Sequence, residues 1–62
     1  MKDKELFDLC NRRIKEHEVA AEMYRRAIDT APDEITKKKF EQAQKQELKL
    51  KAEAERIRSK AQ

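Results

Sequence analysis

The 62-residue chain contains no glycine, one proline and one cysteine. Without glycine it cannot form the glycine-rich loops that hold phosphate groups or dinucleotides. The single cysteine, Cys10, excludes an internal disulfide, and Cys10 with the single His17 cannot supply the four ligands of a tetrahedral zinc site. We therefore expect no enzyme: the sequence suggests no catalytic residue, no cofactor and no metal ligand set.

The sequence also lacks a long apolar run. Charged residues make up 47% of the chain, and no apolar segment approaches the roughly 20 residues that a membrane-spanning helix needs. The charged start, residues 1–5, does not resemble a signal peptide. We expect no membrane association and a cytoplasmic location, because a lone cysteine fits a reducing compartment.

One segment, Thr30-Ala31-Pro32-Asp33-Glu34, interrupts an otherwise helix-compatible sequence. Proline is tolerated in the first turn of a helix, and the residue before it is pushed out of helical geometry. The sequence therefore predicts an all-α fold in a single domain, residues 1–62. Two helices, about residues 4–30 and 32–60, should form an antiparallel hairpin.

Each predicted helix carries a stripe whose members are spaced alternately by three and four residues, as in a coiled coil. The first stripe is Phe7, Cys10, Ile14, His17, Ala21, Tyr24 and Ile28, and the second is Thr36, Phe40, Ala43, Glu47, Leu50, Ala54, Ile57 and Ala61. Folding the chain at Pro32 pairs the stripes so that the residue numbers of facing residues add up to 64. The same folding suggests flanking pairs, Arg12 with Glu55, Val19 with Leu48 and Arg26 with Glu41.

The polar members of the two stripes, His17 and Glu47, face each other in this register. We interpret them as a buried, hydrogen-bonded pair that fixes the register. Two alternatives stay open. A symmetric dimer would bring two such pairs together as a metal site, and the histidine would also suit a pH sensor.

The predicted core is thin, which favours assembly with another chain. The first helix has a second apolar edge, Leu6, Leu9, Ala20, Met23 and Ala27, interrupted by Arg13 and Glu16. Two hairpins that pack into a dimeric four-helix bundle would cover such surface. The candidate surface for a second copy or for another protein consists of Leu6, Leu9, Val19, Met23 and Leu48.

The net charge of +3 lies in the second half of the chain, because residues 1–31 carry seven basic and seven acidic residues. Four cations of the second helix form an outward stripe: Lys38, Lys45, Lys49 and Arg56. Such a stripe can follow a phosphate backbone, so a nucleic-acid partner is an alternative.

Three resemblances bear on these alternatives. The run Ala20, Ala21, Tyr24, Ala27 and Pro32 resembles the second helix of a tetratricopeptide repeat, although Asp8 and Lys15 depart from the pattern of the first. It is also similar to three-helix microtubule-interacting-and-trafficking domains, which would require a further helix. The hairpin architecture is similar to that of the Rop family, whose members are dimers that bind RNA.

Our leading functional hypothesis is a small, non-enzymatic protein-interaction or regulatory module that acts as a homodimer of helical hairpins. The second hypothesis is an RNA- or DNA-binding regulator that uses the basic stripe and is similar to the Rop family in architecture only. The third is a metal-binding helical bundle. These hypotheses differ in whether binding weakens with salt and in whether the purified protein contains metal.

Overall fold

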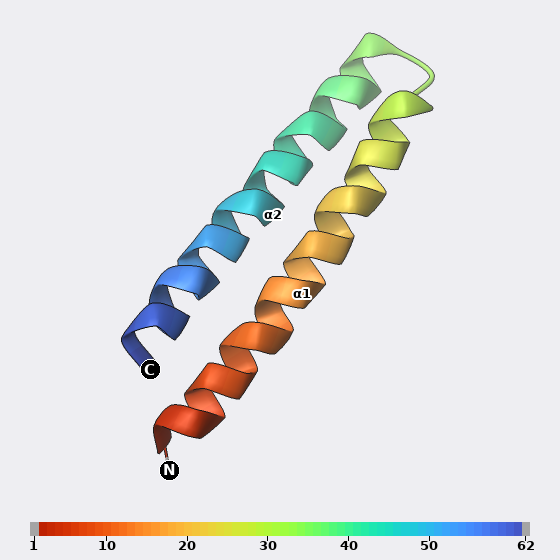
Figure 1. Cartoon of the computed structure of the whole chain (residues 1–62). Coiled ribbons are helices and arrows are strands. Elements are labelled where there is room, and N and C mark those ends of the chain that lie inside the picture. Colours follow the sequence, from red (N-terminus) through yellow and green to blue (C-terminus); the bar gives the residue numbers. More distant parts are fainter. Residues whose placement is uncertain (1, 62) are drawn as a thin grey trace.

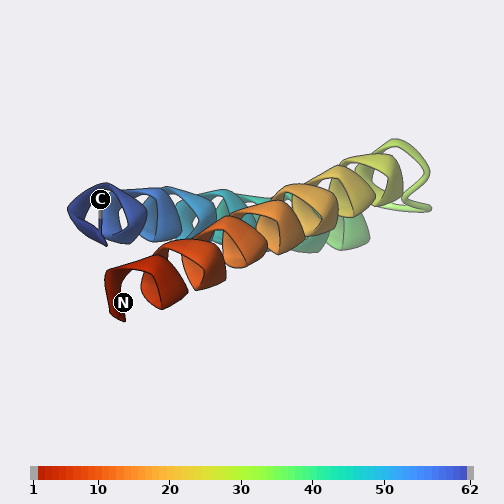
Figure 2. The ribbon, with the colours of Figure 1, turned by 60° about the horizontal axis from the view of Figure 1, so that its bottom comes forward.

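The chain forms two helices of equal length that pack antiparallel as a hairpin (Figure 1). The structure is a computed structural model and describes residues 2–61. Helix α1 spans Lys2–Asp29 and helix α2 spans Glu34–Ala61. The hairpin is long and narrow, 49 × 13 × 10 Å, and both chain ends lie opposite the turn (Figure 2). The predicted all-helical hairpin is confirmed.

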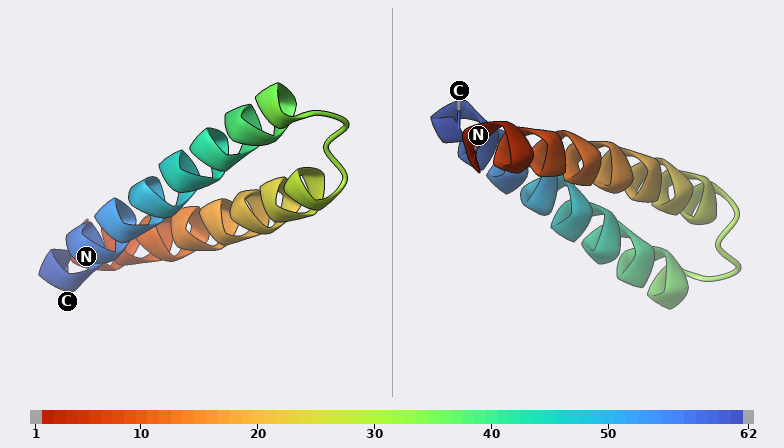
Figure 3. Two further views of the ribbon diagram at one scale, coloured as in Figure 1. Left: turned by 90° about the horizontal axis from the view of Figure 1, so that it is seen from above. Right: turned by 90° about the horizontal axis from the view of Figure 1, so that it is seen from below.

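The ends of both helices suit the helix dipole. Acidic residues occupy the first turn of each helix, and basic residues occupy the last turn. Helix α1 runs without a break from Lys2 to Asp29, so the three-helix alternative is wrong. In Figure 3 the two helices run side by side over their length, crossing at a shallow angle, as packed helix pairs commonly do.

Hydrogen bonds in the turn cap the end of α1 and the start of α2. The Thr30 hydroxyl donates to the Arg26 carbonyl at 3.2 Å, which satisfies a carbonyl left free by the end of α1. At the start of α2, the Thr36 backbone N–H donates to Asp33 Oδ1 at 2.7 Å. Asp33 is therefore the N-cap, and α2 begins at Glu34, two residues after the predicted start at Pro32. No residue in 2–61 has a positive φ, which explains how the chain turns without glycine.

The predicted stripes form the seam between the helices. All seven stripe residues of α1 are buried or half-buried, and on α2 the one exposed member is Ile57, near the open end of the hairpin. The rings of Tyr24 and Phe40 lie 6.3 Å apart, as their predicted pairing requires. The most buried side chains are mostly small: Cys10, Ile14, Ala21, Ala54 and Ala61. No side chain among residues 3–61 is fully buried, so the core is one layer thick.

The predicted flanking pairs are wrong. Arg12 and Arg26 form no ion pair with Glu55 or Glu41 among the described residues, and all four are exposed. Residues 12, 19 and 26 each lie two positions before a seam residue. Two positions correspond to about 200° around a helix, so these side chains leave from the back of α1.

The Asp33 cap makes the turn sensitive to acid. The hydrogen bond from the Thr36 backbone N–H lowers the pKa of Asp33 below its ordinary value of 3.8. A carboxyl whose pKa is lowered by folding stabilises the fold above its unfolded pKa, and this contribution is lost as the pH falls through the folded pKa.

We therefore expect Asp33→Ala to lower the melting temperature at pH 7, because it removes the N-cap acceptor. Asp33→Asn keeps an oxygen acceptor and should be milder. The difference between wild type and Asp33→Asn should shrink as the pH is lowered from 6 to 2. Thermal denaturation followed by circular dichroism measures this, and a difference that is constant with pH would contradict the assigned cap.

Candidate functional site

The polar pair His17–Glu47 lies in the seam, midway along the hairpin. His17 Nδ1 and Glu47 Oε1 are 2.7 Å apart, so the ring N–H donates to the carboxylate. The exposed fractions of the two side chains are 19% and 23%, so the predicted pair is hydrogen-bonded and partly buried. Its position within the seam suits a role in register, because any other alignment would set one of these groups against an apolar neighbour.

One edge of the seam is closed by polar contacts. Lys51 Nζ lies 3.2 Å from Glu18 Oε2, and Arg58 Nη1 donates to Asn11 Oδ1 at 2.8 Å. The Gln44 amide donates to the Ala21 carbonyl at 3.2 Å. Residues 11 and 18 lie four positions after seam residues, which places them beside the seam. We call this side of the hairpin the closed edge.

The opposite edge of α1 carries the leftover apolar residues. We call them the α1 edge stripe: Leu6, Leu9, Arg13, Glu16, Ala20, Met23 and Ala27. Each member lies one position before a seam residue, so the stripe has the same three-and-four spacing, rotated by about 100°. Leu6 and Leu9 are each 41% exposed and Met23 is 65% exposed. Helix α1 therefore has two coiled-coil faces, of which α2 covers one.

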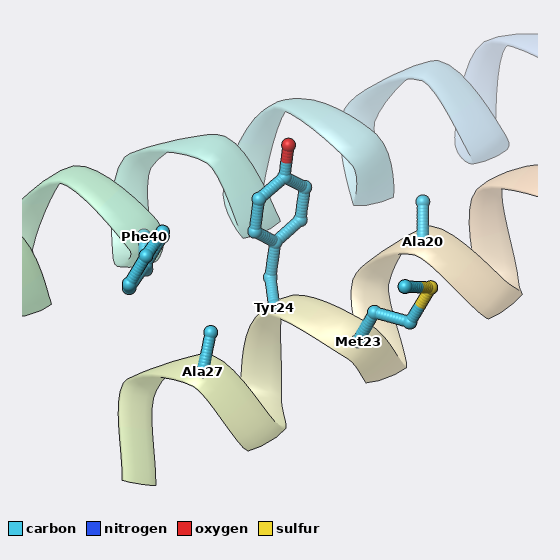
Figure 4. A pocket seen from close by; sticks show the side chains of 5 residues that line it. All are labelled: Ala20, Met23, Tyr24, Ala27 and Phe40. Atoms are coloured by element: carbon cyan, nitrogen blue, oxygen red, sulfur yellow. The ribbon is translucent and has the colours of Figure 1, made fainter. Parts of the chain in front are cut away.

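A groove lies where this stripe meets the seam (Figure 4). Its volume is about 310 Å³, and its lining is Ala20, Met23, Tyr24, Ala27 and Phe40. The ring of Tyr24 reaches from α1 toward α2, whereas the alanine side chains on α1 end after one carbon (Figure 4). The small alanines leave the space, and the apolar lining suits an aliphatic side chain. The sequence indicated the lining residues through their spacing but not the groove.

The structure divides the predicted partner surface. Leu6, Leu9 and Met23 belong to the α1 edge stripe. Val19, which is 52% exposed, lies one turn before Met23 toward the back of α1. Leu48 lies between Gln44 and Lys51, beside the closed edge, and is 47% exposed. Met23 and Leu48 therefore lie toward opposite edges of the hairpin.

The basic stripe lies on the outer face of α2. Lys38, Lys45, Lys49 and Arg56 fall within about 40° of one another around the helix, opposite the seam. All four are exposed, and none forms an ion pair within the described part of the chain. Lys38 and Lys45 line a shallow hollow together with Glu41 and Gln42, so an acidic group interrupts the stripe.

The described residues offer no assembled metal or membrane site. Within residues 2–61, no group of three or more His, Cys, Asp or Glu side chains lies close enough together to hold a metal ion. Neither helix is both long enough and apolar enough to cross a bilayer. Comparisons with protein-family models, with curated proteins and with solved structures found no match to this chain. The surfaces themselves are therefore the basis for a functional proposal.

The His17–Glu47 contact can be measured by a double-mutant cycle. We expect His17→Leu and Glu47→Leu each to destabilise the hairpin, because each leaves the other polar group without its partner. The coupling energy should be about 1–2 kcal/mol, as for a partly buried hydrogen bond to a charged group. The double variant should be close to wild type in stability, because two leucines suit the seam. Chemical denaturation measures all four proteins, and additive effects would mean that the contact contributes nothing.

Proposed function

We propose that the protein is a non-enzymatic interaction module that acts as a homodimer of helical hairpins. The observation that carries this proposal is the α1 edge stripe, a second coiled-coil face with three large apolar side chains in solvent. Protein–protein interfaces regularly bury exposed apolar side chains that are grouped on one face in this way.

The accessible surface supports the same proposal. The hairpin exposes 5195 Å². A compact monomer of 7.4 kDa would expose about 4,200 Å². The excess of about 1,000 Å² is comparable with the roughly 800 Å² that each partner contributes to a standard protein interface. An assembly that covers one face of the hairpin would bring its exposure close to that of a compact protein.

Self-association is tested by Met23→Lys. Sedimentation equilibrium should give the mass of a dimer for the wild type at micromolar concentration. Met23→Lys should weaken the dimer by about tenfold or more, because a charge would enter an apolar interface. Leu48→Lys is the matched control, since it makes the same kind of change beside the closed edge and should leave the mass unchanged. A monomeric wild type would refute the homodimer.

A nucleic-acid-binding regulator is the second candidate, favoured by the four unpaired cations on the outer face of α2. The α1 edge stripe and most of this basic stripe lie on different surfaces, so one assembly has room for both functions, with Lys49 alone close to the second copy. The negative charge of Glu41, which lies beside Lys38 and Lys45, disfavours strong binding of a nucleic acid.

Replacement of Lys38, Lys45, Lys49 and Arg56 by Gln tests this candidate. If the stripe binds a nucleic acid, the wild type should lose affinity steeply with added salt. The variant should bind far more weakly and show a salt slope flatter by about one unit for each lost phosphate contact. Fluorescence anisotropy with a labelled RNA hairpin and a labelled DNA duplex measures both. Equal affinity of wild type and variant would exclude the stripe as the binding surface.

A further inference from the structure

The α1 edge stripe has a symmetric arrangement of residue types. Read from its centre outward, one half is Arg13, Leu9 and Leu6, and the other half is Glu16, Ala20 and Met23. The centre falls between residues 14 and 15, close to the middle of α1. Each half therefore has a charged residue near the centre and apolar residues outside it, and the two charges have opposite sign.

The two central charges have no side-chain partner among the described residues. Arg13 and Glu16 are exposed, and neither belongs to an ion pair or to a side-chain hydrogen bond among the described residues. They interrupt the apolar stripe at two adjacent positions. For a purely apolar partner this interruption would be unfavourable, because two charges would lose water without compensation.

We propose that the partner is a second copy of this chain, whose α1 packs antiparallel on the first α1 through this stripe. The inference rests on the homodimer proposed above and specifies its interface. A two-fold axis through the centre of the stripe sets Arg13 against Glu16 of the second copy, and Glu16 against its Arg13. An isologous interface repeats every contact in this way, so one complementary pair in the sequence becomes two in the dimer.

The same two-fold axis brings apolar side chains of the second copy to the groove. Leu6 of the second copy faces Met23, and Leu9 of the second copy faces Ala20. Both leucines arrive where the alanines leave space in the groove lined by Ala20, Met23 and Ala27. Two large side chains that enter a site lined by small ones follow the knobs-into-holes packing of paired helices.

Helix α2 adds little apolar area but has compatible charges. Its stripe one position before the seam is polar apart from Ile35, so the α1 pair supplies the apolar contact. Ile14 and Leu50 face each other across the hairpin, so the axis passes near Leu50. Lys49 and Glu53 flank that point, and the axis therefore also brings opposite charges together on α2. In this arrangement the four helices form an antiparallel bundle.

Charge reversal tests the interface. Arg13→Glu alone and Glu16→Arg alone should each weaken the homodimer by about tenfold or more, because each sets like charges together twice. The double variant Arg13→Glu/Glu16→Arg should dimerise like the wild type. A mixture of the two single variants should form a heterodimer, although neither variant dimerises well alone. Sedimentation equilibrium measures the masses, and native mass spectrometry with one variant labelled with nitrogen-15 identifies the heterodimer.

Two controls accompany this test. Arg12→Glu and Glu55→Arg make the same charge changes at exposed positions outside the stripe, and both should leave the dimer unchanged. A single variant could lose helicity if the hairpin needs the second copy to stay folded. In that case circular dichroism should show that helicity recovers when the two single variants are mixed.

The outcomes separate this interface from the homodimer itself. A monomeric wild type overturns both. A dimeric wild type whose mass is unaffected by the single reversals overturns the interface and leaves the homodimer standing. Loss of dimer in the single variants without recovery in the mixture or in the double variant also overturns it, because Arg13 and Glu16 then do not meet across the axis.

Discussion

The contact between His17 and Glu47 distinguishes the observed alignment of the two helices from neighbouring ones. Most of the well-buried seam residues are small, and alanine layers tolerate a shift of the helices more readily than large interlocking side chains do. A shift by one heptad would set His17 against Phe40 or Ala54 and leave it without an acceptor. The hydrogen bond of 2.7 Å would therefore be lost in either shifted alignment, which favours the observed one.

This alignment determines which side of the hairpin is available. At the closed edge, Lys51 and Arg58 bridge to α1 and cover the seam with polar contacts. On the other side the described residues make no such contact, and the groove between Ala20, Ala27 and Phe40 remains. The difference between the two edges arises because the residues flanking the seam are long and polar on one side of α1. On the other side they are small or apolar apart from Arg13 and Glu16.

Much of this fold could be predicted from the sequence, because the period of the stripes and the single proline both act locally. The helices, the seam and the pairing of Tyr24 with Phe40 follow from the spacing of the stripes. The turn follows from Pro32. The flanking pairs could not be obtained by extending the same count, since a second row of contacts depends on the angle at which each residue leaves the helix. The start of α2 was predicted two residues early, because the hydrogen bond that makes Asp33 the N-cap and Glu34 the first helical residue depends on the side-chain geometry of the turn. The groove depends on side-chain volumes on both helices, which spacing does not describe.

The position of the chain ends has a consequence for how the hairpin can be rebuilt. The start of α1 and the end of α2 lie on the same side, opposite the turn, and the seam depends on which residues face each other rather than on the order of the helices along the chain. A short linker between the two ends, with new ends opened at residues 31 and 32, would produce a circular permutant with the same seam. Because no described residue at the turn needs a positive φ, cutting the chain there removes no special backbone conformation.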